Sequence, residues 1–408
     1  MKSGLAFLIA ARQCEIAELE HLARTSELVR AISRFTHALQ RERGICSIFL
    51  TSQGRRFRAQ RHEQVVACEQ AEHEVRAHFD RLDTDTTGLC NGARLFARLA
   101  VALHAMDALG GLRRRIGAQA LAPQESTDAF ARLIACLLAV VFEAVDSATD
   151  PEISRVLVAM VNFMQGKEFA GQERALGAGV FASGSVDAKR QQQWQHLIES
   201  QSGCFQVFAE FSGDALLPHG HPGEEETLAE LERLRRIGGA LQAHDTPGAD
   251  LSQTWYDCCT RRIDAMKTVE DMLAARLRRL CERKTAQARA DLRDHEAIVQ
   301  ALARQARAAP AGTAAPYGPR LERSILEMVQ EQSRRLQAMG EELDTVRAAL
   351  NERKVVERAK GLLMQHRRLS EEDAYKALRQ TAMNQKRRLI DVAEAVLSMA
   401  DVLPQCSR

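Results

Sequence analysis

Positive charge is concentrated near the carboxyl end of the chain, where it could bind a polyanion. Residues 353–388 hold 11 Lys and Arg against 4 acidic residues, although the whole chain has a net charge of only +2. A concentrated positive surface attracts polyanions such as nucleic acids. Charge alone also fits a solvated helical face, so both interpretations stay open at this point.

The sequence around this charge indicates short helices. Ser370 followed by Asp373 is a capping-box pattern, which predicts the start of a helix. A break at residues 384–387 precedes a last short helix. Tyr375 and Arg379 lie four residues apart, so they share one helical face and can contact the same partner.

Three stretches in this region resemble the ANTAR domain. They are residues 356–364 (VERAKGLLM), 369–375 (LSEEDAY) and 378–383 (LRQTAM), in the family's order and spacing. The resemblance implies a three-helix RNA-binding module of transcription antitermination regulators. Such modules bind paired hairpins in a nascent leader transcript and prevent the terminator from forming.

Several residues of this module have the right chemistry for RNA. Bases of hairpin loops stack on aromatic rings or guanidinium planes, while Lys and Arg hold phosphates. With the resemblance, this chemistry predicts RNA contacts at Lys360, Tyr375, Arg379 and Lys386. Taken singly, Tyr375 also fits core packing and Lys360 a solvated charge.

A second resemblance lies in the first three hundred residues. Residues 39–44 (LQRERG) and 167–175 (KEFAGQERA) match the LQxERG and KExxGxERA-like motifs of the NIT domain, a helical nitrate- and nitrite-sensing module. A looser third stretch runs from residues 231–236 (LERLRR) to Trp255 and Thr260. Together the three stretches cover most of residues 15–290.

Arginine chemistry suits the ligand that this resemblance implies. Nitrate is a planar monoanion, and arginine offers a planar fork of donors that matches it. An anion taken out of water also needs compensating positive charge. We therefore expect nitrate or nitrite ligands at Arg43, Arg174 and Arg236, with Arg235 nearly equal to Arg236. The alternative is a structural ion pair, for instance between Arg43 and Glu42 or Glu173.

Composition and periodicity predict an all-α protein. Hydrophobic residues make up 45% of the chain, aromatic residues only 5%, and charged residues 27%. Apolar positions recur at helical spacing, and no segment shows sustained strand alternation. We expect a sensor of two packed four-helix bundles, linked through a coiled coil to a small three-helix module. Asp150-Pro151 predicts an N-cap and the first turn of one sensor helix.

The expected domains follow each other along the chain. A NIT-like sensor covers residues 15–304, a linker rich in Pro and Gly covers 305–320, a coiled coil covers 321–352, and an ANTAR-like module covers 345–402. A seam of positions with alternating spacings of four and three, apolar except for Gln332, predicts a coiled coil and hence a homodimer. These positions are Ile325, Val329, Gln332, Leu336, Met339, Leu343, Val346 and Leu350. The alternative is an amphipathic helix packed within its own chain.

Other kinds of site are disfavoured. The ten Cys form no CxxC pair, which fits a reducing cytoplasm. His73 and His78 are five residues apart, so they share no helical face for zinc. No catalytic motif stands out, and we expect no enzyme, metal or cofactor besides the signal anion. No apolar run approaches the ~20 residues of a membrane span, so we expect no membrane partner.

The two resemblances together imply a nitrate- or nitrite-responsive regulator of transcription antitermination, and we expect it to be cytoplasmic. Its expected partners are the anion, leader mRNA hairpins and a second copy of the chain, and its expected targets are genes of nitrate assimilation. The alternative is a constitutive nucleic-acid-binding dimer whose amino-terminal bundle binds a protein partner.

Overall fold

The fold comes from a computed structural model of the whole chain. The structure describes residues 4–82, 92–146, 148–184, 186–213, 224–241, 249–308, 319–367, 369 and 371–400. Across these ranges every regular element is a helix, and no strand occurs. The all-α prediction is therefore confirmed.

The chain divides into two compact units, Met1–Gly340 and Glu341–Arg408. The helices up to residue 308 are α1 (Gly4–Thr51), α2 (Arg58–Asp80), α3 (Gly92–Asp107), α4 (Leu109–Gly117), α5 (Pro123–Asp146), α6 (Pro151–Ser183), α7 (Ala188–Ser212), α8 (Glu224–Ala240) and α9 (Ala249–Ala308). The remaining helices are α10 (Pro319–Arg367), α11 (Glu371–Gln385) and α12 (Leu389–Ala400).

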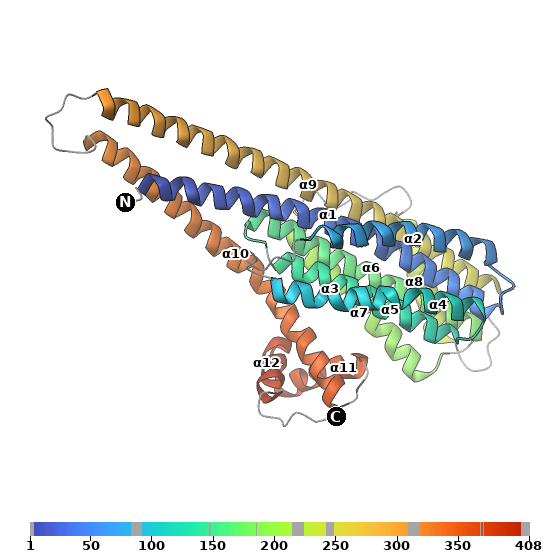
Figure 1. The fold of residues 1–408 in the computed structure, drawn as a ribbon. Coiled ribbons are helices and arrows are strands. Elements are labelled where there is room, and N and C mark those ends of the chain that lie inside the picture. Colours follow the sequence, from blue (N-terminus) through green and yellow to red (C-terminus); the bar gives the residue numbers. More distant parts are fainter. Residues whose placement is uncertain are drawn as a thin grey trace. The chain divides into compact units, whose positions relative to one another are not determined.

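The first unit consists of two groups of helices that share a long interface. In one group α1 packs against α2 and α5, and α3 and α4 pack against α5. In the other, α6 packs against α7, α8 and α9, and α8 also contacts α9. The groups meet where α1 contacts α6 and α9 and where α5 contacts α6. Figure 1 shows α1 and α9 side by side along much of their length, so the arrangement fits two packed bundles.

Helix α6 is the central element of this unit. Its N-cap Asp150 accepts a hydrogen bond from the Ile153 amide at 3.0 Å, with Pro151 in the first turn, as the sequence predicts. It ends at Gly184, whose φ of 71° is a left-handed cap. Buried residues occur on all sides of the helix. A helix covered on every side has to satisfy its polar side chains inside the protein.

One helical stretch has the length and composition of a membrane span. Ala93–Gly117 reaches a mean hydropathy of 1.4 over its best window, and only that stretch does so in the part of the chain that the structure describes. It is interrupted between α3 and α4, and both pieces contact α5. Charged residues such as Arg98 and Asp107 lie within this stretch, so it contains no uninterrupted apolar run of the length of a membrane span.

The second unit has a small core of its own. Ala359 from α10, Leu378 and Ala382 from α11, and Val392 and Ala393 from α12 form its buried cluster. These positions recur at helical spacing, so one face of each helix closes the core.

A tight turn joins α11 to α12, at the predicted break. Lys386 has a φ of 52°, and the Arg387 amide donates to the Ala382 carbonyl at 3.0 Å. This left-handed C-terminal turn stops the helix at Gln385. Ser370, the predicted N-cap of α11, lies outside the described residues.

The region expected to connect the units is described only in part. Helix α9 continues to Ala308 and α10 begins at Pro319, while residues 309–318 lie outside the described ranges. On the predicted heptad positions, the Leu336 side chain is 53% exposed, whereas Leu343 and Val346 are buried. The pairing of two copies through this helix stays a prediction.

Candidate functional site

Arg174 lies in the interface of α1, α6 and α9 with only 1% of its surface exposed. From α6, Nη2 donates to the Gln40 carbonyl of α1 at 2.8 Å, and Nη1 donates to Thr260 Oγ1 of α9 at 3.0 Å. The guanidinium carbon lies 5.0 Å from the ring centre of Tyr256, a cation–π contact. All of these partners are neutral.

Arg43, a residue of α1, lies in the same interface. Its Nη1 and Nη2 donate to the two carboxylate oxygens of Glu168 on α6, at 2.5 and 3.2 Å. Gln40 and Gln172 also donate to this carboxylate, at 2.9 and 3.0 Å. Arg43 is thus neutralised by a buried, fully hydrogen-bonded acid, a bidentate pair of the strong kind.

Two motif glycines make room for these arginines. A Cβ on Gly171 of α6 would lie 2.4 Å from Arg43 Nη2, and a Cβ on Gly44 of α1 would lie 2.9 Å from Arg174 Nη2. Each motif therefore supplies one arginine and also the glycine that admits the arginine of the other motif. This reciprocal packing explains why each motif needs its glycine.

The charges in this interface do not balance. Among the described residues Arg174 makes no ion pair, because Glu168 is paired with Arg43 and every Arg174 partner is neutral. The Nε atoms of Arg43 and Arg174 are buried without a hydrogen-bond partner. Arg12, Arg30 and Arg34 also have unpaired Nε atoms, but Arg12 forms an ion pair with Glu15, and the other two side chains are partly exposed. Arg174 is therefore a buried cation that lacks a counter-charge.

The surroundings of His37 indicate the same excess of positive charge. His37 on α1 is mostly buried, with its Nε2 3.8 Å from Asp264. Burial, together with the positive charges of Lys167, Lys267, Arg41 and Arg174, lowers the pKa of His37 to about 2. The helix interface thus disfavours a further cation, first because it is buried and second because positive charges surround it.

The acids that might have paired with Arg43 have other partners. Glu42 accepts two hydrogen bonds from Arg113 of α4, both at 2.8 Å. Glu173 accepts two from Arg235 of α8, both at 2.7 Å. The alternative that Arg43 forms an ion pair was therefore right in kind, but the partner is Glu168.

Glu173 lies on the side of α6 that faces α7 and α8. Besides Arg235, it accepts from Trp194 Nε1 at 3.0 Å and from Gln201 at 2.7 Å. Burial acts to raise the pKa of Glu173, but the hydrogen bonds and charge of Arg235, with Gln201 and Trp194, lower it below its ordinary value. Glu173 is thus held as a satisfied carboxylate.

Arg236 does not reach the interface of α1, α6 and α9. Its side chain is exposed, and its Nε donates to the Glu232 carbonyl of its own helix at 3.3 Å. Arg235 points into the protein instead, where it binds Glu173. The structure thus brings together Arg43 and Arg174, but not Arg236.

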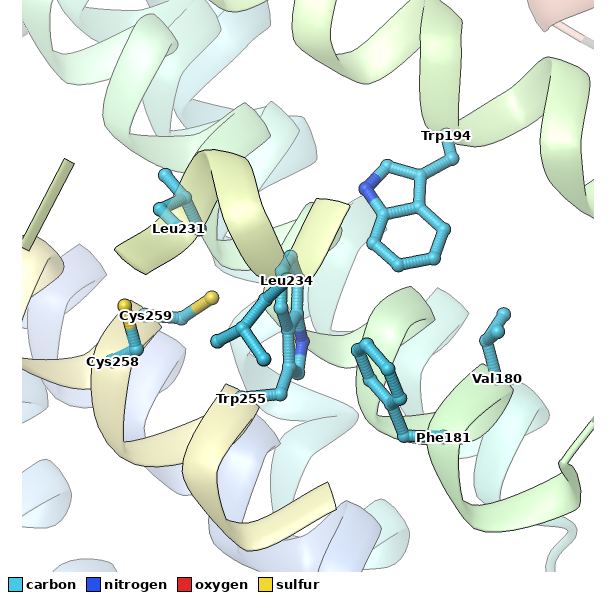
Figure 2. Close-up of a cluster of buried hydrophobic side chains, with 8 residues drawn as sticks. All are labelled: Val180, Phe181, Trp194, Leu231, Leu234, Trp255, Cys258 and Cys259. Carbon is cyan, nitrogen blue, oxygen red and sulfur yellow. The ribbon is translucent and has the colours of Figure 1, made fainter. Parts of the chain in front are cut away.

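An aromatic cluster packs against α6 close to Arg174, and Figure 2 shows its side chains. Trp194 of α7 and Trp255 of α9 converge on Phe181 of α6, and Trp255 Nε1 donates to the Arg174 carbonyl at 3.0 Å. A Cβ on Gly177 would lie only 2.3 Å from the Trp255 ring. The close packing fixes the turn of α6 that carries Arg174.

Sequence reasoning missed Glu168, Arg113 and Tyr256 as parts of this site. Glu168 lies inside one of the two sensor motifs, so the sequence identifies it as a candidate, but the sequence does not show that it pairs with Arg43. Tyr256 lies four residues before Thr260, so both share one face of α9, and that spacing was the available signal. Arg113 carries no such signal.

In the second unit the expected RNA-binding residues fall into two groups. Lys360 is only 5% exposed, and its Nζ lies 5.9 Å from the ring centre of Tyr375, which is half-buried. Arg379 and Lys386 are exposed, Arg379 on α11 and Lys386 in the turn that follows. Lys360 and Tyr375 are thus brought together, while the other two lie on the surface.

Comparison with known proteins supports both resemblances. Residues 34–278 match the family described as nitrate and nitrite sensing (NIT), and residues 344–397 match the ANTAR domain. A nitrate regulatory protein from Klebsiella oxytoca is 33% identical over 396 residues, which cover 95% of this chain and 93% of that protein. The structure of the NasR transcription antiterminator aligns with a TM-score of 0.57 at 30% identity, over 97% of this chain and 99% of that chain. The chain therefore belongs to the nitrate- and nitrite-sensing family, and within it carries an ANTAR domain after the sensor.

Proposed function

We propose that the protein regulates transcription antitermination in response to nitrate or nitrite, and that the anion binds at Arg174 and Arg43. The observation that carries the site is the buried guanidinium of Arg174, which has neutral partners only. A buried charge without a partner costs several kcal/mol, and a bound anion removes that cost. The two matched domains, a sensor and an RNA-binding module, support a regulator rather than an enzyme.

The charge of the site suits a monoanion. Arg43 and Arg174 bring two positive charges and Glu168 one negative charge, so a single negative charge completes the balance. Each arginine keeps a buried Nε–H that can donate to an anion. In this arrangement Arg174 supplies the uncompensated charge, and Arg43 supplies a further donor. Arg236 is not part of the proposed site.

The anion would act by changing how three helices pack. Arg43 starts on α1, Arg174 on α6, and the Arg174 partners Tyr256 and Thr260 on α9. A ligand that binds these groups better in one packing of the helices shifts the population toward that packing, by as much as its difference in affinity. The output would be a change in RNA binding by the ANTAR domain.

For the output we propose that Tyr375, Arg379 and Lys386 contact leader RNA hairpins. Arg379 and Lys386 are exposed and can hold phosphates. We assign Lys360 a supporting role, because it is buried beside the Tyr375 ring. A regulator that acts on nascent RNA works in the cytoplasm, and we propose that location.

We also propose that the protein is a homodimer through α10. Leu336 lies on the heptad seam and is 53% exposed, as expected for a seam that a second copy covers. Leu336→Lys should convert a dimer to a monomer in light scattering, while Ala338→Lys, beside the seam, should not. A monomeric unsubstituted protein would overturn this proposal.

The decisive experiment is a gel shift of the full chain on a leader RNA with two hairpins, in nitrate, nitrite, chloride or no added anion. We expect nitrate or nitrite, but not chloride, to strengthen binding. Arg174→Ala should abolish that effect and leave the basal RNA binding, and Arg236→Ala should leave both unchanged. Equal RNA binding in every anion would favour a constitutive RNA-binding protein instead.

A further inference from the structure

Tyr256 is a polar residue of the α1, α6 and α9 interface, where its ring contacts Arg174. It lies on α9, one turn before Thr260, and is partly exposed. Its ring packs under the Arg174 guanidinium, 5.0 Å from centre to carbon, and meets the Phe57 ring edge-on at 6.4 Å. The ring is therefore held from two sides.

The hydroxyl of Tyr256 and the guanidinium of Arg174 converge on one point. A Cβ on Gly44 would lie 2.9 Å from Tyr256 Oη and also 2.9 Å from Arg174 Nη2. Both polar atoms thus face the bare backbone of α1 at Gly44, where the absence of a side chain leaves them room. Among the described residues the Tyr256 hydroxyl makes no hydrogen bond with the protein, so its proton can be given to a ligand.

We propose that the Tyr256 hydroxyl donates a hydrogen bond to the anion held by Arg174, and that it favours nitrate over nitrite. This inference rests on the proposed function. A guanidinium fork presents two parallel donors, which satisfy two oxygens of a planar anion. Nitrate has a third oxygen that needs another donor, whereas nitrite has none.

Thr260 offers a contrast within the same face of α9. Its hydroxyl oxygen already accepts from Arg174 Nη1 at 3.0 Å. It therefore orients the arginine, and its loss should affect every anion that Arg174 binds in the same way. The two hydroxyls, one turn apart, predict different patterns of selectivity.

The test is isothermal titration of the full-length protein with sodium nitrate and sodium nitrite at constant chloride. Tyr256→Phe keeps the ring over Arg174 and removes only the hydroxyl. We expect it to weaken nitrate binding about tenfold and nitrite binding less than about threefold, since a hydrogen bond to a charged ligand is lost for nitrate alone. Thr260→Val should weaken both anions by similar factors.

Each outcome separates this inference from the function on which it rests. If Tyr256→Phe binds nitrate as tightly as the unsubstituted protein, or weakens both anions equally, the selectivity role is wrong, while loss of binding in Arg174→Ala still upholds the site. If the unsubstituted protein binds neither anion, the proposed function itself fails. A thermal melt without anion verifies that Tyr256→Phe is folded.

Discussion

Glu173 and Arg174 are neighbours on α6, equally buried, and differ in how their charges are met. Glu173 faces α7 and α8, where Arg235, Trp194 and Gln201 saturate its carboxylate. Arg174 faces α1 and α9, where it meets a carbonyl, a hydroxyl and an aromatic ring. One helix thus carries a completed ion-pair network on one side and an uncompensated charge on the other.

The difference separates a structural role from a binding role. A buried charge that already has all its hydrogen-bond and ion-pair partners is not stabilised further by a ligand. Its removal leaves those partners buried without the group that they bind. A buried charge without a counter-ion is costly to the folded protein and becomes favourable when a ligand arrives. The incomplete set of partners, more than burial, is the reason why we propose that Arg174 rather than Glu173 binds the anion.

The largest effect on stability should come from Glu173→Ala. It leaves Arg235 and the Trp194 and Gln201 donors without their acceptor, and we expect a loss of about 3–5 kcal/mol in the free energy of unfolding. Urea denaturation measures it. Glu210→Ala, an exposed acid on α7, is the control and should change stability by less than about 0.5 kcal/mol. Equal effects of the two substitutions would contradict the structural role that we assign to Glu173.

Arg174→Met should behave in the opposite way. Without anion it removes an uncompensated buried charge, so we expect unchanged or higher stability. Saturating nitrate, at about 100 times Kd, should stabilise the unsubstituted protein by about 2.7 kcal/mol and the variant not at all. Thermal melts with and without nitrate measure both. A variant that loses several kcal/mol without anion would show that Arg174 is structural, like Glu173.

Substitutions of two glycines of α6 should have smaller effects on stability than substitution of Glu173. Gly171→Ala forces a Cβ against Arg43 Nη2, so we expect a loss of about 1–3 kcal/mol and weaker nitrate binding. Gly179 is an exposed position near the carboxyl end of α6, and a Cβ there would meet nothing within 4 Å. Gly179→Ala should therefore stabilise the helix by up to about 1 kcal/mol. Melting curves that rank the two variants the other way would contradict the packing described for Arg43.

The smallest effect should appear in acid. Because the folded-state pKa of Glu173 lies below the ordinary value of 4.5, its ionisation stabilises the protein above that pH. This contribution is lost as the pH falls from about 4.5 through the folded-state pKa. Glu173→Gln should therefore lose less stability than the unsubstituted protein between pH 5 and 3, in urea titrations at each pH. Parallel losses would mean that other acids dominate in this range.

Much of the architecture followed from local patterns. Helical periodicity, the Asp150-Pro151 cap and the break after α11 are properties of neighbouring residues, so they could be read from the chain alone. The two sensor motifs and the ANTAR motifs likewise showed the family, because their spacing is local. Arg43 and Arg174 were found in this way as candidate ligands.

The pairing of charges could not be read in the same manner. Arg43 meets Glu168 across 125 residues of sequence, and Arg174 meets the Gln40 carbonyl across 134. Which acid neutralises which arginine depends on how α1 and α6 are rotated and shifted against each other. Sequence therefore placed Arg236 beside the other two, whereas the packing of α8 turns Arg235 inward and leaves Arg236 in solvent.

The sequence by itself thus determined the helices, the order of sensor and output, and the residue types available for binding an anion and RNA. Only the tertiary structure decided that Arg174 lacks a counter-charge, that Tyr256 meets it above Gly44, and that Lys360 is buried beside Tyr375. The physical reason is that helix formation depends on residues three and four apart, while charge compensation depends on side chains that only packing brings together.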